Sequence, residues 1–169
     1  LLKVIEEPND NINFILINSN KRVLTTLKSR CINFKISLSQ NQTIEIANKI
    51  INQDIYDIFN EELINYYNTP GQLFKILKVS EKFEIDVKNL SLKNFLSLII
   101  KNKLYKKDKV LIELTYSFID NYFRSKVNIK NVEILNFYNL FLKKIKNTKI
   151  YNLDEETLFM EFEDRILNG

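Results

Sequence analysis

The character of the chain changes at residues 39–51, which read SQNQTIEIANKII. Ser39 with Gln42 three residues later is the capping-box pattern, in which each side chain binds a backbone N–H of the other residue. The apolar residues that follow recur at helical spacing on one face, and they are Ile44, Ile46, Ala47, Ile50 and Ile51. We therefore predict a helix here, and every later segment of the chain also has helical spacing.

The rest of the chain predicts six further helices. They fall at about residues 60–67, 70–83, 91–103, 108–126, 129–146 and 154–167. Only two glycines and two prolines occur in 169 residues, which favours long uninterrupted helices over a many-turned β architecture. This number of helices with short connections is typical of a helical bundle.

The part of the chain before Ser39 has a different pattern. Residues 1–7 have the spacing of a helix end, which Pro8 stops. The run 12–17 is apolar and rich in β-branched residues, and 32–36 alternates apolar with polar residues, so both predict strands. Helical spacing at 23–29 lies between them. The predicted fold is therefore mainly α, with a short strand–helix–strand end of an α/β domain ahead of the helical region.

Composition excludes several classes of site. The chain has no histidine and one cysteine, Cys31, so a Cys/His metal site and an intrachain disulfide are excluded, and a reducing cytoplasm is expected. No apolar run approaches the ~18 residues that a membrane helix needs, so no membrane partner is expected. The chain starts without Met or a signal peptide, so we interpret it as a fragment. Two isolated glycines cannot form a phosphate-binding loop, so ATP hydrolysis by this segment alone is not expected.

Charge is distributed unevenly. Residues 101–149 carry twelve basic and four acidic residues, a net charge of +8, whereas residues 150–169 have a net charge of −5. The basic stretch could face DNA, but no base-reading motif accompanies it, and a lysine-rich helix surface is more often a solvated face. The aromatic residues of 116–123 and 137–141 recur at three- and four-residue spacing, which favours core packing over stacking on bases.

Three motifs occur in order within the first 38 residues. They are Leu1-Leu2-Lys3 with Glu6-Glu7-Pro8, then Phe14-Ile15-Leu16, then Ser29-Arg30-Cys31. Together they resemble the AAA+ clamp-loader family of bacterial DNA polymerase III, and most closely its delta-prime type of subunit. The resemblance implies that residues 1–38 end an AAA+ base domain, that 39–88 form a three-helix lid, and that 89–169 form a helical collar that joins subunits.

The same resemblance implies roles for individual residues. Arg30 corresponds to an arginine finger that acts in trans on ATP and Mg²⁺ bound by a neighbouring subunit, and Ser29 and Cys31 complete its motif. Independently of the resemblance, Cys31 is expected to pack as a small buried residue, as free cysteines commonly do. A guanidinium suits this role because it is permanently charged and forks onto phosphate oxygens. Without the flanking motifs, Arg30 would be interpreted as a helix-end arginine in a surface ion pair. Asn18 falls at the sensor-1 position, although such residues are more often turn formers.

A further segment, Thr69-Pro70-Gly71, resembles the start of the sensor-2 helix of the lid. In subunits that hydrolyse ATP this segment supplies an arginine, but Gly71 stands at the matching position and Gln72 follows it. The missing arginine favours the delta-prime type over a gamma/tau-type motor ATPase of the same complex, which is the first alternative. A stand-alone helical interaction module is the second alternative, for which the chain after residue 40 would suffice.

The function that the resemblance implies is assembly of the loader that places the sliding clamp on primed DNA. The expected partners are the motor ATPase and delta subunits, the sliding clamp and primed DNA. The segment itself is expected to hold no cofactor, no metal and no catalytic site of its own. Arg30 would couple ATP hydrolysis in the neighbouring subunit to release of the clamp.

Overall fold

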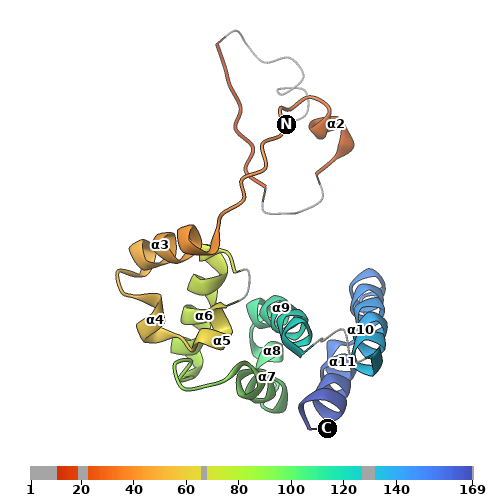
Figure 1. Ribbon diagram of the computed structural model, residues 1–169. Helices are drawn as coiled ribbons and strands as arrows, with labels where there is room; N and C mark the ends of the chain where they lie inside the picture. Colours follow the sequence, from red (N-terminus) through yellow and green to blue (C-terminus); the bar gives the residue numbers. More distant parts are fainter. Residues whose placement is uncertain (1–10, 19–22, 66–67, 127–131, 169) are drawn as a thin grey trace. The chain divides into compact units, whose positions relative to one another are not determined.

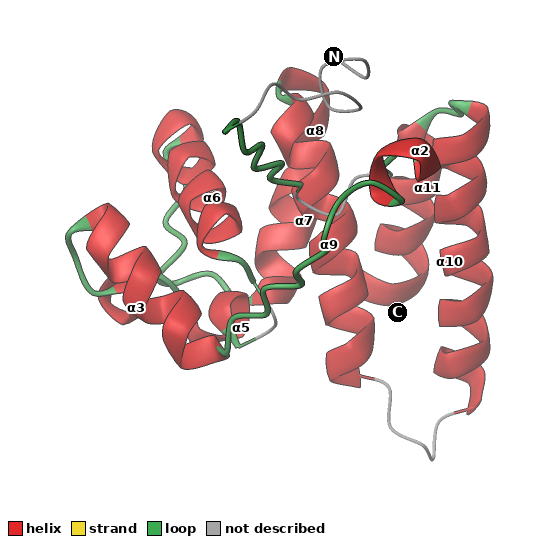
Figure 2. Cartoon of the chain, turned by 90° about the horizontal axis from the view of Figure 1, so that it is seen from above, coloured by secondary structure: helices red, strands yellow, loops and turns green. Residues whose placement is uncertain are grey.

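The computed structural model describes residues 11–18, 23–65, 68–126 and 132–168, with the backbone alone for 132–133. The chain divides into two compact units, Leu1–Ser37 and Leu38–Gly169. Every regular element within the described ranges is a helix (Figure 2), so the chain is mainly α, as the sequence predicts.

The described part of the first unit contains one short helix, α2 (Thr25–Lys28), and otherwise consists of turns and loops (Figure 1). The predicted strands at 12–17 and 32–36 have no regular secondary structure, so this part of the prediction is wrong for the described residues. A strand forms only where its backbone pairs with a neighbouring strand, and neither segment has such a pairing in the described part of this unit. Their apolar side chains are accordingly exposed. The predicted helix at 1–7 lies outside the described residues.

The second unit begins with α3 (Gln40–Ile51), which starts as the sequence predicts. The Ser39 hydroxyl accepts a hydrogen bond from the Gln42 backbone N–H at 3.3 Å, and the Gln42 amide oxygen accepts one from the Ser39 N–H at 2.9 Å. This reciprocal pair satisfies donors that the start of a helix leaves open. Asn52 ends the helix in the left-handed conformation, with φ 60°.

Two single-turn helices follow, α4 (Ile55–Ile58) and α5 (Glu61–Ile64). Apolar spacing predicts the second of them but not the first. Asp54 precedes α4 and Asn60 precedes α5, and each side chain accepts a hydrogen bond at 3.0 Å from the backbone N–H two residues later. Because of this extra capped turn, the range expected to form a three-helix lid, 39–88, contains four helices among its described residues.

The next helix, α6 (Pro70–Phe83), has the bounds that the sequence predicts, and α7 (Leu92–Lys101) and α9 (Lys109–Lys126) agree with prediction to within two residues. A short helix between α7 and α9, α8 (Leu104–Lys107), is not predicted. Lys103 takes the left-handed conformation, with φ 48°, and starts a new helix direction after α7. Four residues are too few to show helical spacing in the sequence.

The chain ends with α10 (Val132–Tyr151), α11 (Glu155–Phe162) and a π-helical turn, η1 (Glu163–Leu167). The helix α10 continues past its predicted end at residue 146, whereas α11 with η1 agrees with the prediction of 154–167. None of the described helices combines the length and the apolar character that a membrane crossing needs.

Aromatic rings join the helices of the second unit. The rings of Phe95 and Phe118 meet edge-on at 5.2 Å and connect α7 with α9. Phe123 of α9 lies 5.7 Å from Phe141 of α10 and 5.4 Å from Phe162 of α11. All five side chains are buried, so the core role predicted for the aromatic residues of 116–123 and 137–141 is confirmed for Phe118, Phe123 and Phe141.

Candidate functional site

Arg30 lies just past the C-terminal end of α2. This helix is a single turn, in which the Leu24 carbonyl accepts hydrogen bonds from the backbone N–H groups of Leu27 and Lys28, at 3.1 and 3.0 Å. Two β-branched residues, Thr25 and Thr26, begin the helix, and such residues form helices weakly. The structure therefore puts Arg30 at a helix end, as predicted, but a turn and a loop follow it in place of a strand.

Two side chains of the motif meet at one carbonyl oxygen. The Ser29 hydroxyl and the Arg30 Nη1 both donate a hydrogen bond to the Thr26 carbonyl oxygen, each at 3.0 Å. Carbonyl groups in the last turn of a helix lack partners within the helix, so these side chains cap it. The Arg30 side chain is exposed. A guanidinium also binds charged acceptors such as phosphate oxygens, and those hydrogen bonds are stronger than one to a neutral carbonyl.

The turn after Arg30 is held by a residue that sequence reasoning did not single out. The Asn33 amide donates to the carbonyl oxygens of Lys28 at 3.3 Å and of Cys31 at 3.2 Å. An asparagine shortly after a helix end is a signal for such a turn, because its short amide reaches nearby backbone groups. Cys31 is a free thiol and is half-buried, less buried than expected.

Asn18 belongs to a different segment from the Ser29-Arg30-Cys31 motif. It is exposed at the end of the loop 12–18, where a strand was predicted. The sensor-1 assignment assumes that a strand presents this residue, and the described structure has no strand there. The structure thus joins Ser29 and Arg30, places Cys31 in the adjoining turn, and leaves the role of Asn18 a prediction.

The helix α6 starts at the segment that resembles a sensor-2 motif. The Gln72 backbone N–H donates to the Thr69 hydroxyl at 3.2 Å, and the Thr69 N–H donates to the Gln72 amide oxygen at 2.8 Å. Pro70 occupies the first helical position, where its missing N–H costs nothing. Gly71 is exposed, and a Cβ added there would meet no atom within 4 Å. Steric crowding therefore does not account for the absence of an arginine at Gly71.

Comparison with known proteins points to the same part of the chain. Residues 1–40 match the family model described as DNA polymerase III, delta subunit. The match therefore relates residues 1–40 to subunits of the DNA polymerase III clamp-loader type. No curated protein and no solved structure matches the chain. All three motifs of the first 38 residues lie in the matched range, so the match supports the predicted likeness to clamp-loader subunits.

The basic stretch, residues 101–149, is partly neutralised within the chain. Glu156 of α11 forms ion pairs with both Lys103 and Lys106, and Glu161 pairs with Lys144. Hydrogen bonds from Lys103 and then Lys106 lower the pKa of Glu156 to about 2. These contacts join the basic helices to the acidic end of the chain, which favours the solvated-face interpretation over a surface that is wholly available to DNA.

Apolar burial, more than charge, holds α11 in place. Leu158, Phe159 and Phe162 are 5%, 0% and 0% exposed. Burying three such side chains stabilises the packed helix by about 5–9 kcal/mol in total. The ion pairs join half-buried carboxylates to exposed lysines, and pairs open to solvent contribute less. We therefore expect that a polyanion competing for the lysines would not displace this helix.

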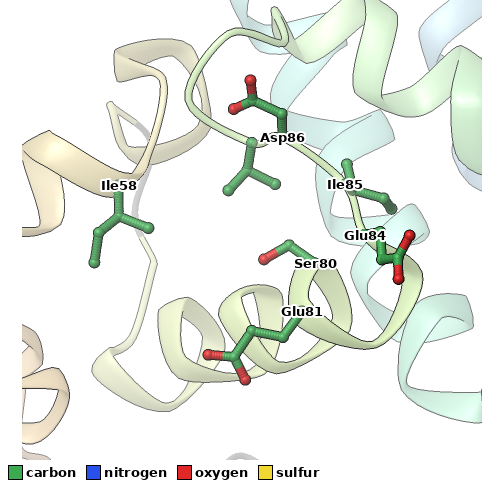
Figure 3. Close-up of a pocket in the computed structure, with 7 residues that line it drawn as sticks. Ile58, Ser80, Glu81, Glu84, Ile85 and Asp86 are labelled. Carbon is green, nitrogen blue, oxygen red and sulfur yellow. The ribbon is translucent and has the colours of Figure 1, made fainter.

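A shallow depression of about 400 Å³ lies between α4 and the end of α6 (Figure 3). It is lined by Ile58, Ser80, Glu81, Glu84, Ile85, Asp86 and Val87. The carboxylates of Glu81 and Asp86 point away from each other in Figure 3. Lys78 pairs with Glu81 at 2.8 Å, and hydrogen bonds from Asn89 lower the pKa of Asp86. Across the described residues, no group of three or more His, Cys, Asp or Glu side chains could hold a metal ion.

Proposed function

We propose that this chain is a delta-prime-type subunit of the DNA polymerase III clamp loader and that Arg30 is its arginine finger. The observation that carries the proposal is the exposed guanidinium of Arg30 at the end of α2, within the range 1–40 that matches the family model. In this role Arg30 contacts the terminal phosphate of ATP that a neighbouring motor ATPase subunit binds together with Mg²⁺.

The local geometry supports this role in two ways. The guanidinium is permanently charged and presents several donors in a plane, which suits the spread of negative charge on a phosphoryl group in transfer. The Ser29 hydroxyl donates to the same Thr26 carbonyl as Arg30 does. When the Arg30 guanidinium turns to a phosphate, Ser29 keeps the last turn of α2 capped, so the backbone that carries the finger is preserved.

The proposed subunit type and partners rest on the rest of the chain. We assign residues 39–88 to a lid and 89–169 to a collar that contacts the motor ATPase and delta subunits, while the assembled loader acts on the sliding clamp and primed DNA. Gly71 at the sensor-2 position supports the delta-prime type over a gamma/tau-type motor, because glycine supplies no cation. Asn18 stands at the sensor-1 position in this assignment. ATP binding and hydrolysis by the purified full-length protein alone would instead support the motor alternative.

The test is the ATPase rate of the reconstituted loader in the presence of sliding clamp and primed DNA. Arg30→Ala should slow hydrolysis at the affected site by ~10³–10⁵, the range found for arginine fingers. Arg30→Lys should also fail, because a compact ammonium does not reproduce the planar fork. Lys28→Ala removes an exposed cation from the same turn and is the matched control, with an unchanged rate expected. Normal ATPase activity of a correctly assembled Arg30→Ala loader would refute the finger.

A further inference from the structure

One side of α10 combines exposed apolar and basic side chains. Leu135, Leu142 and Ile150 follow one another at intervals of seven and eight residues, which places them on the same side of the helix, and Lys143 and Lys146 lie between them. The three apolar side chains are 39%, 38% and 59% exposed. These five residues are called the outer face of α10. In Figures 1 and 2 this helix lies at the edge of the second unit, and the exposure of these side chains shows that no described helix of that unit covers them.

The charged residues of the outer face are both positive. Lys143 and Lys146 are exposed, and within the described part of the chain no carboxylate forms an ion pair with either of them. The adjacent Lys144 points the other way around the helix and pairs with Glu161. No acidic residue occurs between Ile134 and Tyr151. The outer face therefore offers apolar contact area and uncompensated positive charge together.

The opposite side of α10 shows what kind of element matches this chemistry. There α11 covers the helix with an apolar ring and a carboxylate, since Phe162 lies 5.7 Å from Phe141 and Glu161 pairs with Lys144. The last helix is thus an acidic amphipathic helix seated on a basic, apolar side of α10. The outer face has the same combination of basic and apolar side chains, but no described helix of the second unit packs on it.

We propose that the outer face of α10 binds an acidic amphipathic helix of a neighbouring clamp-loader subunit. This inference rests on the proposed function and names the chemistry of a partner at the collar. The two lysines favour an acidic partner by charge complementarity. The leucine and isoleucine side chains favour a partner with apolar side chains, as an amphipathic helix has. A DNA backbone offers phosphates to the lysines but no apolar surface to the leucine and isoleucine side chains. An amphipathic helix supplies both properties on one face.

The first test compares two sides of the same helix. Leu142→Glu combined with Lys146→Glu places two negative charges in the outer face. Tyr151→Glu is the control, because Tyr151 is 68% exposed and lies ~180° around the helix from Leu142. Assembly of the protein with purified motor ATPase and delta subunits is measured by analytical ultracentrifugation. We expect the double variant to bind at least ~10-fold more weakly and the control to bind within ~2-fold of wild type.

Carbodiimide cross-linking tests the partner directly, because it joins an amine to a carboxylate in contact with it. In the wild-type assembly, Lys143 or Lys146 should be joined to Asp or Glu of a neighbouring subunit, as read by mass spectrometry. If wild type and double variant assemble equally, or if the cross-links avoid both lysines, this inference is wrong while the proposed function stands. If the wild-type protein does not join the loader at all, both fail. If the double variant loses affinity for duplex DNA or phosphatidylserine vesicles but assembles normally, the partner is not a protein helix.

Discussion

Replacing Phe162 with alanine tests whether α11 is part of the core of the second unit. The Phe162 side chain is 0% exposed, and its ring lies 5.4 Å from Phe123, 5.7 Å from Phe141 and 5.9 Å from Tyr122. Truncating a buried phenylalanine costs about 3–5 kcal/mol, because apolar contacts are lost and a cavity is left. Each kcal/mol shifts the melting temperature by about 2–4 °C in a chain of this length. We therefore expect Phe162→Ala to lower the Tm by about 6–20 °C.

The measurement is thermal unfolding followed by far-ultraviolet circular dichroism, with urea unfolding as a second readout. Met160→Ala is the matched control, because Met160 lies in the same helix and is 48% exposed. Its free energy of unfolding should stay within about 1 kcal/mol of wild type. Equal and small effects of the two substitutions would refute the packing of α11 against α9 and α10, and with it the argument that apolar burial holds the acidic helix in place.

Two further predictions concern a helix cap and an acidic side chain. Thr69→Ala should lower the free energy of unfolding, measured with urea, by ~1 kcal/mol, because the Gln72 N–H loses its acceptor. Thr69→Ser keeps a hydroxyl and should retain most of the wild-type stability. An alanine variant as stable as wild type would exclude a stabilising cap. The pKa of Glu156 is about 2 in the fold against an ordinary value of 4.5, so its stabilising contribution is present above pH 4.5 and is lost as the pH falls toward 2. The Tm of Glu156→Gln should therefore decrease less than that of wild type between pH 4.5 and pH 2. An equal decrease in the two proteins would contradict the ion pairs of Glu156 with Lys103 and Lys106.

Local patterns predict the long helices well because their signals are contained in short stretches of sequence. The pair Ser39 and Gln42 predicts the start of α3, and the structure forms both hydrogen bonds of that capping box. The helices α4 and α8 are missed because a single turn contains too few residues to show a period. The strand predictions at 12–17 and 32–36 fail for a different reason, since alternation indicates a suitable surface but does not supply the neighbouring strand.

The sequence predicts which residues form the candidate site, but it does not predict their contacts. The motif Ser29-Arg30-Cys31 points to Arg30 in the sequence, and the match over residues 1–40 covers the same motif. The meeting of the Ser29 and Arg30 side chains at the Thr26 carbonyl appears only in three dimensions, because it depends on where α2 ends. Asn33, which closes the turn, carries only the general preference of asparagine for such positions.

The sequence by itself predicts that the second unit is helical, that the last twenty residues are negatively charged, and that Arg30 lies at the end of a short helix. The apolar face of residues 154–167 also shows that this helix must be covered, but a helical period does not reveal whether its own bundle or another protein covers it. Only the packing of Phe162 against Phe123 and Phe141 answers this question. The reason is physical: burial is a relation between segments distant in sequence, and it is fixed when their side chains meet in three dimensions.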